Sequence, residues 1–361
     1  MLPISDPIRA SLRRTLAGDS ARWPELADDD VRALIEHGVA PFVYAVAHVP
    51  GLRNEAIHAA AVEPIRLDDL RVVLDAFAAR GITALLMKGT PLAYELYSAP
   101  ELRPRGDTDL LIPRDSLEAV RETMQSLGFA ERLTSGDEHG VRQVTFVRRD
   151  TYGVEHAYDI HWDVTNTPLF AETLRYDELR ARAVNVPAIG AHALALSRLD
   201  ALLLACVHRV AHHHDSERLI WLVDVALLRE RMTRAEHERF WRLAAERRVI
   251  GVCMRSIELA DEWCGRAPHA RAEEWLSREE IGRDEPSRVY LDREITYGEV
   301  MLADLRALPW RARLRRLWQL AWPSAKFMQQ SFPSHSRLAL PLLYVYRGAR
   351  GIRRLFRRAG A

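Results

Sequence analysis

Three carboxylates at two places in the chain have the pattern of a metal site. Asp107 and Asp109 are one residue apart in a segment that ends in two leucines and an isoleucine, so on a strand they point to the same face. Asp159 lies in a second extended run and adds a third carboxylate. Converging carboxylates repel one another unless a cation lies between them, and Mg²⁺ prefers such ligands together with substrate phosphates. The sequence therefore predicts that Asp107, Asp109 and Asp159 bind Mg²⁺.

The strand of Asp159 carries further polar residues on the same face. Glu155 and Asp163 share this face by period-two spacing, and either is an alternative third carboxylate. His161 shares it too. Its imidazole can orient a phosphate, help an acceptor to lose its proton, or form a hydrogen bond inside the core. Catalytic and structural roles for His161 both stay open at this point.

A second motif, Lys88-Gly89-Thr90-Pro91, has the features of a phosphate-binding turn. Residues 83–87 are apolar and predict a strand, after which Thr90 can cap a helix whose first residue is Pro91. Backbone N–H groups at a helix start bind phosphate oxygens, and Gly89 leaves room for them to approach. A phosphate cradle beside an acidic metal site indicates nucleotidyl or phosphoryl transfer more strongly than either motif alone.

Lysine is rare in this chain, which makes the position of Lys88 informative. Of the 51 basic residues only Lys88 and Lys326 are lysines. A compact ammonium group binds a phosphate oxygen as a point charge, which the planar guanidinium of arginine does not imitate. An arginine-biased composition alone explains the same count, but the place directly before Gly89 favours a functional lysine.

Two histidines further along are candidates for substrate contact. His208 and His212 lie four residues apart on an expected helix, which is also the spacing of zinc ligands, but no Glu follows His208 as in the metalloprotease motif. We therefore favour a helix that offers these histidines to a cleft, or a merely polar helix side, over a zinc site. Asp224, within an apolar run, is expected to pair with Arg218 or a histidine.

These residues must be positioned by an α+β fold with three regions. Residues 1–80 are expected to be helical, residues 81–170 to form the catalytic core, and residues 171–361 to form a larger helical domain with a basic end. In the core, alternating patterns predict strands over residues 83–87, 108–112, 144–148 and 155–162 and helices over residues 91–97 and 116–127. Apolar residues at three and four spacing predict later helices over residues 193–214, 218–232, 234–247 and 250–264. The polar residues 265–300 are expected to form a solvated linker or helix pair.

Composition narrows the class of protein. At 361 residues the chain is long enough for two domains, and a net charge of +1 argues against a protein that coats nucleic acid. Its three cysteines lack metal-ligand spacing and leave one unpaired in any disulfide scheme, which favours a reducing, cytoplasmic setting. No signal peptide or run of eighteen apolar residues occurs, so we expect no transmembrane helix.

The C-terminal end mixes apolar residues with an arginine cluster. A solvated amphipathic helix is the favoured interpretation of residues 338–358, with contact to an anionic membrane surface and binding of nucleic acid as alternatives. Aromatic residues do not alternate with basic ones as in a base-stacking groove, so no specific nucleic acid is predicted. In a further hypothesis the long helical region and the basic end chiefly dock a partner.

The order of the motifs resembles a known family. A Lys-Gly pair with a leucine- and tyrosine-rich helix, then Arg-Pro-x-Gly-Asp-x-Asp-Leu-Leu from Arg103, then Asp-x-His-Trp from Asp159, is similar to the uncharacterised nucleotidyltransferase family of bacteria. That family is a distant branch of the DNA polymerase β-like nucleotidyltransferase superfamily. The segment that begins at His208 resembles its helical region, and Phe332 with Pro333 resembles its C-terminal part.

The resemblance implies a polymerase β-like core with a small mixed sheet and a two-metal mechanism. Asp107 and Asp109 would bind two Mg²⁺ ions that bridge the phosphates of a nucleoside triphosphate, while Asp159 would bind the second ion and activate an acceptor hydroxyl. Pyrophosphate would leave by in-line displacement, with cations neutralising the charge that develops.

It also implies where the donor nucleotide lies. Gly89 and Thr90 would hold the triphosphate, and Lys88 and Arg103 are candidates for contacting its oxygens. In one respect the chain departs from the superfamily: Gly89 precedes Asp107 by eighteen positions and is followed by threonine, where many members have a glycine-serine pair closer to the acidic pair. The connecting segment must therefore be longer here.

The sequence as a whole predicts a Mg²⁺-dependent enzyme that moves a nucleoside monophosphate from a nucleoside triphosphate to a hydroxyl of a small molecule, peptide or protein. One alternative is another phosphate-centred transferase that acts on a phosphorylated metabolite or peptide. A second alternative, from a different class, is a non-catalytic nucleotide-binding or antitoxin-like module.

Overall fold

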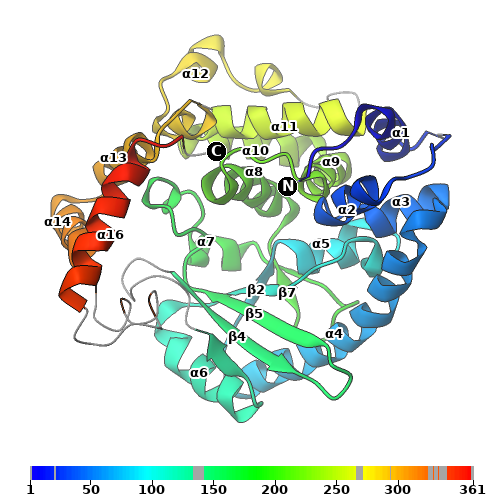
Figure 1. Ribbon diagram of the computed structural model, residues 1–361, viewed down its shortest axis with the longest axis horizontal. Helices are drawn as coiled ribbons and strands as arrows, with labels where there is room; N and C mark the ends of the chain where they lie inside the picture. The colour runs from blue at the N-terminus through cyan, green and yellow to red at the C-terminus, as the bar shows by residue number, and fades with distance from the viewer. Residues whose placement is uncertain are drawn as a thin grey trace.

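The computed structural model describes residues 2–19, 22–132, 142–265, 271–292, 294–323, 328, 332 and 340–358. Lys326 and Pro333 lie outside these described residues. Within the described part, helices from both ends of the chain surround one mixed sheet (Figure 1). The α+β class expected from the sequence is therefore confirmed.

The N-terminal region is helical, as predicted. It contains α1 (Asp6–Leu16), α2 (Asp28–Glu36), α3 (Ala40–Ala47) and the long α4 (Arg53–Ala79). The C-terminal half of α4 packs against the sheet through Leu70, Val73 and Phe77, whereas α1 to α3 pack toward the later helices.

The described residues form a seven-stranded sheet in the order β3-β4-β5-β2-β1-β7-β6. Its strands are β1 (Leu85–Met87), β2 (Thr108–Leu111), β3 (Ala130–Arg132), β4 (Gln143–Arg149), β5 (Glu155–His161), β6 (Val184–Asn185) and β7 (Leu194–Ala195). Pairs β1–β7 and β2–β5 are parallel and the other four pairs are antiparallel. The predicted strands β1, β2, β4 and β5 are confirmed, and together they form the centre of the sheet.

The central strands separate two hydrophobic cores because successive side chains point to opposite faces. Leu85, Met87 and Leu111 face the core that contains the helical region, whereas Leu86 and Leu110 face the core beneath α4 and α6 (Leu117–Ser126). The odd-numbered positions of β2 therefore point toward the helical region.

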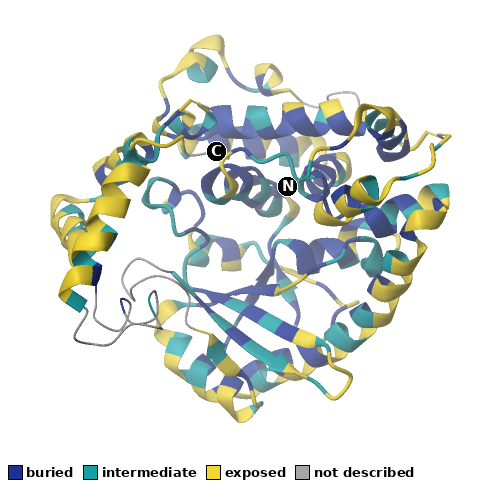
Figure 2. Ribbon diagram, in the orientation of Figure 1, coloured by how far each residue is buried: buried dark blue, intermediate teal, exposed yellow. Residues whose placement is uncertain are grey.

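The helical region follows the sheet. It contains α7 (Tyr176–Ala181), α8 (Arg198–His213), α9 (Leu219–Arg231), α10 (Arg234–Glu246), α11 (Ile250–Cys264), α12 (Arg278–Gly282), α13 (Tyr297–Ala307), α14 (Trp310–Ala321) and α16 (Leu340–Leu355). In Figure 2 the sides of α8 and α11 that face the interior are dark blue, consistent with their many buried apolar residues.

The predicted start of α8 was wrong. A helix was expected over residues 193–214, but Leu194 and Ala195 form β7, which pairs with β1. The helix begins only at Arg198, because the hydroxyl of Ser197 caps it by accepting a hydrogen bond from the backbone N–H of Asp200 at 3.3 Å.

The expectation of a solvated linker over residues 265–300 was also wrong in part. Tyr290 and Leu276 are buried in the core of the helical region. The carboxylate of Glu285 accepts hydrogen bonds from the backbone N–H groups of Ile250 and Gly251, at 2.9 and 2.8 Å, and so satisfies two free donors at the start of α11. This polar segment therefore closes the helical region instead of linking two parts.

One hydrophobic core joins the three regions that were expected from the sequence to be separate. Buried residues of α1 to α3 pack with those of α8, α9 and α11 and with one face of β1 and β2. The division at residues 80 and 170 stays a prediction, although β6 and β7 extend the sheet beyond residue 170. Among the described residues, no helix is both long and apolar enough to span a membrane.

Candidate functional site

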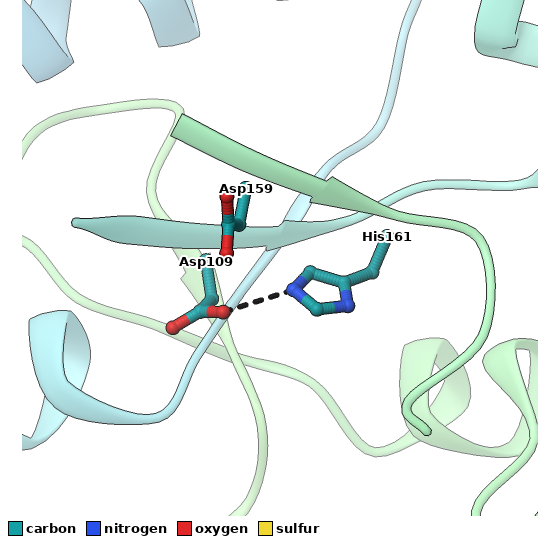
Figure 3. A group of neighbouring side chains, drawn as sticks. All are labelled: Asp109, Asp159 and His161. Atoms are coloured by element: carbon teal, nitrogen blue, oxygen red, sulfur yellow. Dashed lines mark hydrogen bonds and ion pairs between the residues drawn. The ribbon is translucent and has the colours of Figure 1, made fainter. Parts of the chain in front are cut away.

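The register of β2 and β5 brings two of the predicted carboxylates together. Asp109 and Asp159 are direct neighbours in this parallel pair, and His161 follows on the same face of β5. Asp109, Asp159 and His161 each offer one ligand atom, and these atoms lie within 4.8 Å of one another (Figure 3). Among the described residues, these three form the group whose geometry could hold a metal ion.

Asp109 is buried and bonded to two partners, the ammonium of Lys88 and the imidazole of His161. The Lys88 ammonium donates to its Oδ1 at 2.6 Å, and Nε2 of His161 lies 2.9 Å from the same oxygen. Burial alone would raise the pKa of the Asp109 carboxyl, but the charge of Lys88 and the contact with His161 outweigh it, so its pKa lies well below the ordinary value. Burial and the Lys88 charge also lower the pKa of His161. The Asp109 carboxyl is therefore ionised at neutral pH.

Asp159 is oriented by two residues of the neighbouring strand β4. The hydroxyl of Thr145 donates to its Oδ1 at 2.6 Å, and the amide of Gln143 donates to its Oδ2 at 3.3 Å. Sequence reasoning missed both residues. Their period-two alternation with Val144 on a predicted strand was the available signal, because it marks a polar face beside β5.

Asp107, the other predicted ligand, does not belong to this group of three. It immediately precedes β2 and its side chain reaches solvent, yet it lines the same pocket as Asp109 and Asp159. Desolvation by the pocket wall, followed by the negative charges of Asp109 and Asp159, raises the pKa of Asp107 to about 6. A bound cation would relieve this repulsion, which is the electrostatic condition that a metal site requires.

The alternatives to Asp159 are placed elsewhere. Asp163 pairs with Arg142, and Glu155 is an exposed residue at the far end of β5. Neither belongs to the group with metal-binding geometry.

The turn between β1 and α5 (Gly89–Leu96) differs from the prediction in one detail. Thr90 was expected to cap the helix, but the helix already begins at Gly89, so Lys88 occupies the capping position and Thr90 lies in the first turn. Pro91 is still tolerated, because N–H groups in the first turn have no partner inside a helix. The hydroxyl of Thr90 is buried without a hydrogen-bond partner.

Arg103 packs directly over Gly89. A Cβ at Gly89 would lie 2.9 Å from Cζ of Arg103, so only glycine leaves room for this guanidinium. Asp224 of α9 holds the other side of Arg103, with Nε to Oδ1 at 2.9 Å and Nη2 to Oδ2 at 2.6 Å, and Tyr97 donates to the same carboxylate at 2.8 Å. Asp224 was expected to pair with Arg218 or a histidine. Instead it forms a buried ion pair with Arg103, which lies in the segment between α5 and β2.

The wall opposite the acidic group is formed by α8 and α9. His208 and His212 line it together with His213 and Trp221, in agreement with one of the two interpretations that their spacing favoured. Burial lowers the pKa of His212 to about 3 and that of His213 to about 4, with the Lys88 charge as the next cause, and it lowers the pKa of His208 as well. These imidazoles are therefore neutral. The rings of His213 and Trp221 lie 4.3 Å apart.

One pocket of about 340 Å³ lies between the sheet and the helical region. Every residue predicted from the sequence lines it except Thr90 and His161, which lie directly behind its wall. Sequence reasoning did not select Arg105, Arg218 or Trp221, which also line it.

Comparison with known proteins identifies the family. The profile of a family described as uncharacterised nucleotidyltransferase matches residues 24–265, about two thirds of the chain. The chain belongs to this family. The match covers the acidic group, the β1–α5 turn and the histidines of this nucleotidyltransferase family member, and it confirms the resemblance seen in those motifs. Phe332 and Pro333 lie outside the matched residues. A search of curated proteins found no match.

Proposed function

We propose that this nucleotidyltransferase family member moves a nucleoside monophosphate from a nucleoside triphosphate to a hydroxyl of a small molecule, peptide or protein, with Mg²⁺ as cofactor and a polymerase β-like core. The observation that carries the proposal is the shared pocket, in which carboxylates of β2 and β5 meet Lys88 and Arg103. Family membership supports the reaction class.

The donor set fits Mg²⁺. Asp107, Asp109 and Asp159 offer hard oxygen ligands in one pocket, Asp109 is ionised, and the pKa of Asp107 is raised by desolvation and by its negatively charged neighbours. We assign these three carboxylates as the ligands. Bound Mg²⁺ would neutralise phosphate charge and orient the triphosphate for displacement.

The basic residues of the pocket suit the triphosphate. Lys88 holds its ammonium group at the edge of the acidic group, where a phosphate oxygen bound to the metal would arrive. Arg103 lies against the start of α5, so its charge and the positive end of the helix act on the same place. Arg218 lines the pocket from the opposite wall.

The rings on the α8–α9 wall suit the base. His208, His212, His213 and Trp221 present uncharged planar rings to the pocket. A nucleobase is also planar and uncharged, and stacks favourably on such surfaces. We therefore place the phosphates near the sheet and the base near α8 and α9.

In the proposed step the acceptor oxygen forms a bond to the α-phosphorus, the bond from that phosphorus to the bridging oxygen breaks, and pyrophosphate leaves. Asp159 receives the proton of the hydroxyl. Thr145 and Gln143 hold the Asp159 carboxylate in one orientation for this transfer.

The test is calorimetric titration with ATP, CTP, GTP and UTP, each with Mg²⁺ and then with EDTA. We expect at least one nucleotide to bind only with Mg²⁺, and the Asp107→Asn variant to lose this binding. Asp68→Asn is the matched control, because Asp68 is an exposed residue of α4 whose side chain keeps 78% of its accessible surface. Failure of all four nucleotides to bind would overturn the proposal.

Pyrophosphate release separates the remaining alternatives. Nucleotide-dependent release with a hydroxyl acceptor supports nucleotidyl transfer. Transfer without pyrophosphate indicates another phosphate-centred transferase, and Mg²⁺-dependent binding without turnover over a broad acceptor panel indicates a nucleotide-binding module.

A further inference from the structure

Helix α14 exposes a continuous apolar stripe. Trp310, Leu314, Leu317 and Trp318 follow one another at helical spacing, and all four are exposed; Trp310 and Trp318 keep 64% and 69% of their accessible surface. None of the residues of α14 is buried. Exposure of two tryptophans on one side of a helix is costly in water unless another surface covers them.

Helix α16 repeats this pattern. Leu342, Val345, Tyr346 and Ile352 lie on one side of the helix, and Phe356 directly follows its last residue; these side chains keep 56% to 79% of their accessible surface. Only Leu343 of this helix is buried. In Figure 2 nearly the whole visible side of α16 is yellow, which agrees with these values.

The two helices lie side by side at one edge of the molecule (Figure 1). The hydroxyl of Tyr344 donates to the backbone oxygen of Pro323 at 2.6 Å, and Arg347 donates to that of Leu320 at 2.8 Å. The rings of Trp322 and Tyr344 stack with centroids 5.6 Å apart. The exposed stripes of α14 and α16 therefore belong to one edge, which we call the basic apolar edge.

The charged side chains of this edge are all positive. Residues 310–322 and 340–358 contain ten arginines and no acidic residue, although the whole chain has a net charge of only +1. The arginines are Arg311, Arg313, Arg315, Arg316, Arg347, Arg350, Arg353, Arg354, Arg357 and Arg358. Arg358 forms an ion pair with Glu294 and Arg354 lies over the ring of Tyr297, so these two also anchor the end of α16 to α13.

We propose that the basic apolar edge binds the surface of an anionic lipid bilayer, with α14 and α16 lying in the interface. Amphipathic helices with tryptophan, phenylalanine and leucine on one side and arginine beside them bind in this way, because apolar burial and attraction to anionic headgroups act together. The proposal does not depend on the chemistry of the pocket.

Other occupants fit less well. Leucine, isoleucine and valine side chains provide no stacking surface for bases, so a nucleic acid would leave much of the apolar stripe uncovered. A second copy of the chain would bring two arginine-rich edges into contact without acidic partners. An anionic bilayer covers the apolar stripe and neutralises the arginines at the same time.

The test is flotation of the full chain with vesicles of phosphatidylcholine alone and vesicles that also contain phosphatidylglycerol. We expect binding only to the anionic vesicles, with a decrease as salt is raised. Replacing Arg350 and Arg353 by Gln should weaken binding on the order of 30-fold, since each basic residue near the surface contributes about a factor of five. Replacing Trp318 and Phe356 by Ser as well should weaken binding to the anionic vesicles further.

Matched variants on α4 control for surface changes in general. Ile57→Ser with Val72→Ser removes two apolar side chains that are 52% and 51% exposed, and should leave vesicle binding unchanged. Thermal unfolding checks that every variant is folded. Equal binding to both vesicle types, no binding to either, stronger binding to duplex DNA, or dimerisation that Trp318→Ser abolishes would each overturn the proposal.

Discussion

Lys88 has a backbone conformation that lysine rarely adopts, with φ of 57° and ψ of −132°. Lys88 is the single residue between the end of β1 and the start of α5. Its ammonium group contacts Asp109. Strain of this kind persists only where surrounding contacts fix it, and it is commonly found at functional sites. The contact between Lys88 and the acidic group is thus built into the turn.

Replacing Lys88 by Arg should weaken Mg²⁺-dependent nucleotide binding about tenfold while leaving the fold intact. The Nζ atom fits 2.6 Å from Asp109, and a longer planar guanidinium must displace either this carboxylate or the phosphate. Calorimetric titration measures the affinity. Lys88→Met, which removes the charge, is the comparison; an Arg variant that binds as tightly as the natural chain would refute the point-charge role.

Replacing Asp224 by Asn should lower the free energy of unfolding by about 3 kcal/mol, because it leaves the buried guanidinium of Arg103 without its counter-charge. The side chains of Arg103 and Asp224 are only 7% and 3% exposed, so water cannot substitute. Urea unfolding measures the change. Asp29→Asn breaks an exposed pair with Arg32 and should cost little; equal effects of the two variants would contradict this account.

At the scale of elements, local patterns predicted the centre of the sheet because alternation and turn residues are local signals. The acidic residues of β2 and β5 followed from the same alternation. By contrast, β7 has only two residues and is defined by its pairing with β1, so no local pattern marks it. The contact between Arg103 and Asp224 spans 121 positions, and only the packing of α9 against α5 creates it.

Helix α8 carries a prediction about pH. The pKa of His212 is lowered to about 3, first by burial and next by the charge of Lys88, whereas an unfolded histidine binds a proton near pH 6.5. Between these values the unfolded state binds more protons, so stability is full above about pH 6.5 and is lost as the pH falls.

Replacing His212 by Gln should therefore reduce the stability lost between pH 7 and pH 5 by about 1 kcal/mol, a value that allows for the partial exposure of the ring. Gln can still form a hydrogen bond with Thr165, which now lies 2.9 Å from the imidazole. Urea unfolding at both pH values measures the difference. His58→Gln, at an exposed position of α4, is the control; identical pH dependence in all three proteins would contradict the prediction.

At the scale of the whole molecule, the pocket exists because the sheet and the helical region share a core. Asp109 and Asp159 of the pocket come from β2 and β5, and its histidines and Trp221 come from α8 and α9. Helix α1, at the other end of the chain, packs against α11, where Arg9 and Arg13 lie over the ring of Trp263. The N-terminal helix α1 therefore packs against the helical region whose α8 and α9 form one wall of the site.

This arrangement predicts that the three regions expected from the sequence unfold together. Leu12 of α1 is fully buried, and Leu12→Ala should cost about 3 kcal/mol through lost burial and the cavity that remains. Because the core of α1 continues to α9 and to one face of β1, calorimetry should show one transition that moves as a whole to lower temperature. Ile57→Ala, at an exposed position, should leave the temperature of this transition unchanged. Two transitions, of which Leu12→Ala shifts only one, would instead mean that the N-terminal helices form an independent domain.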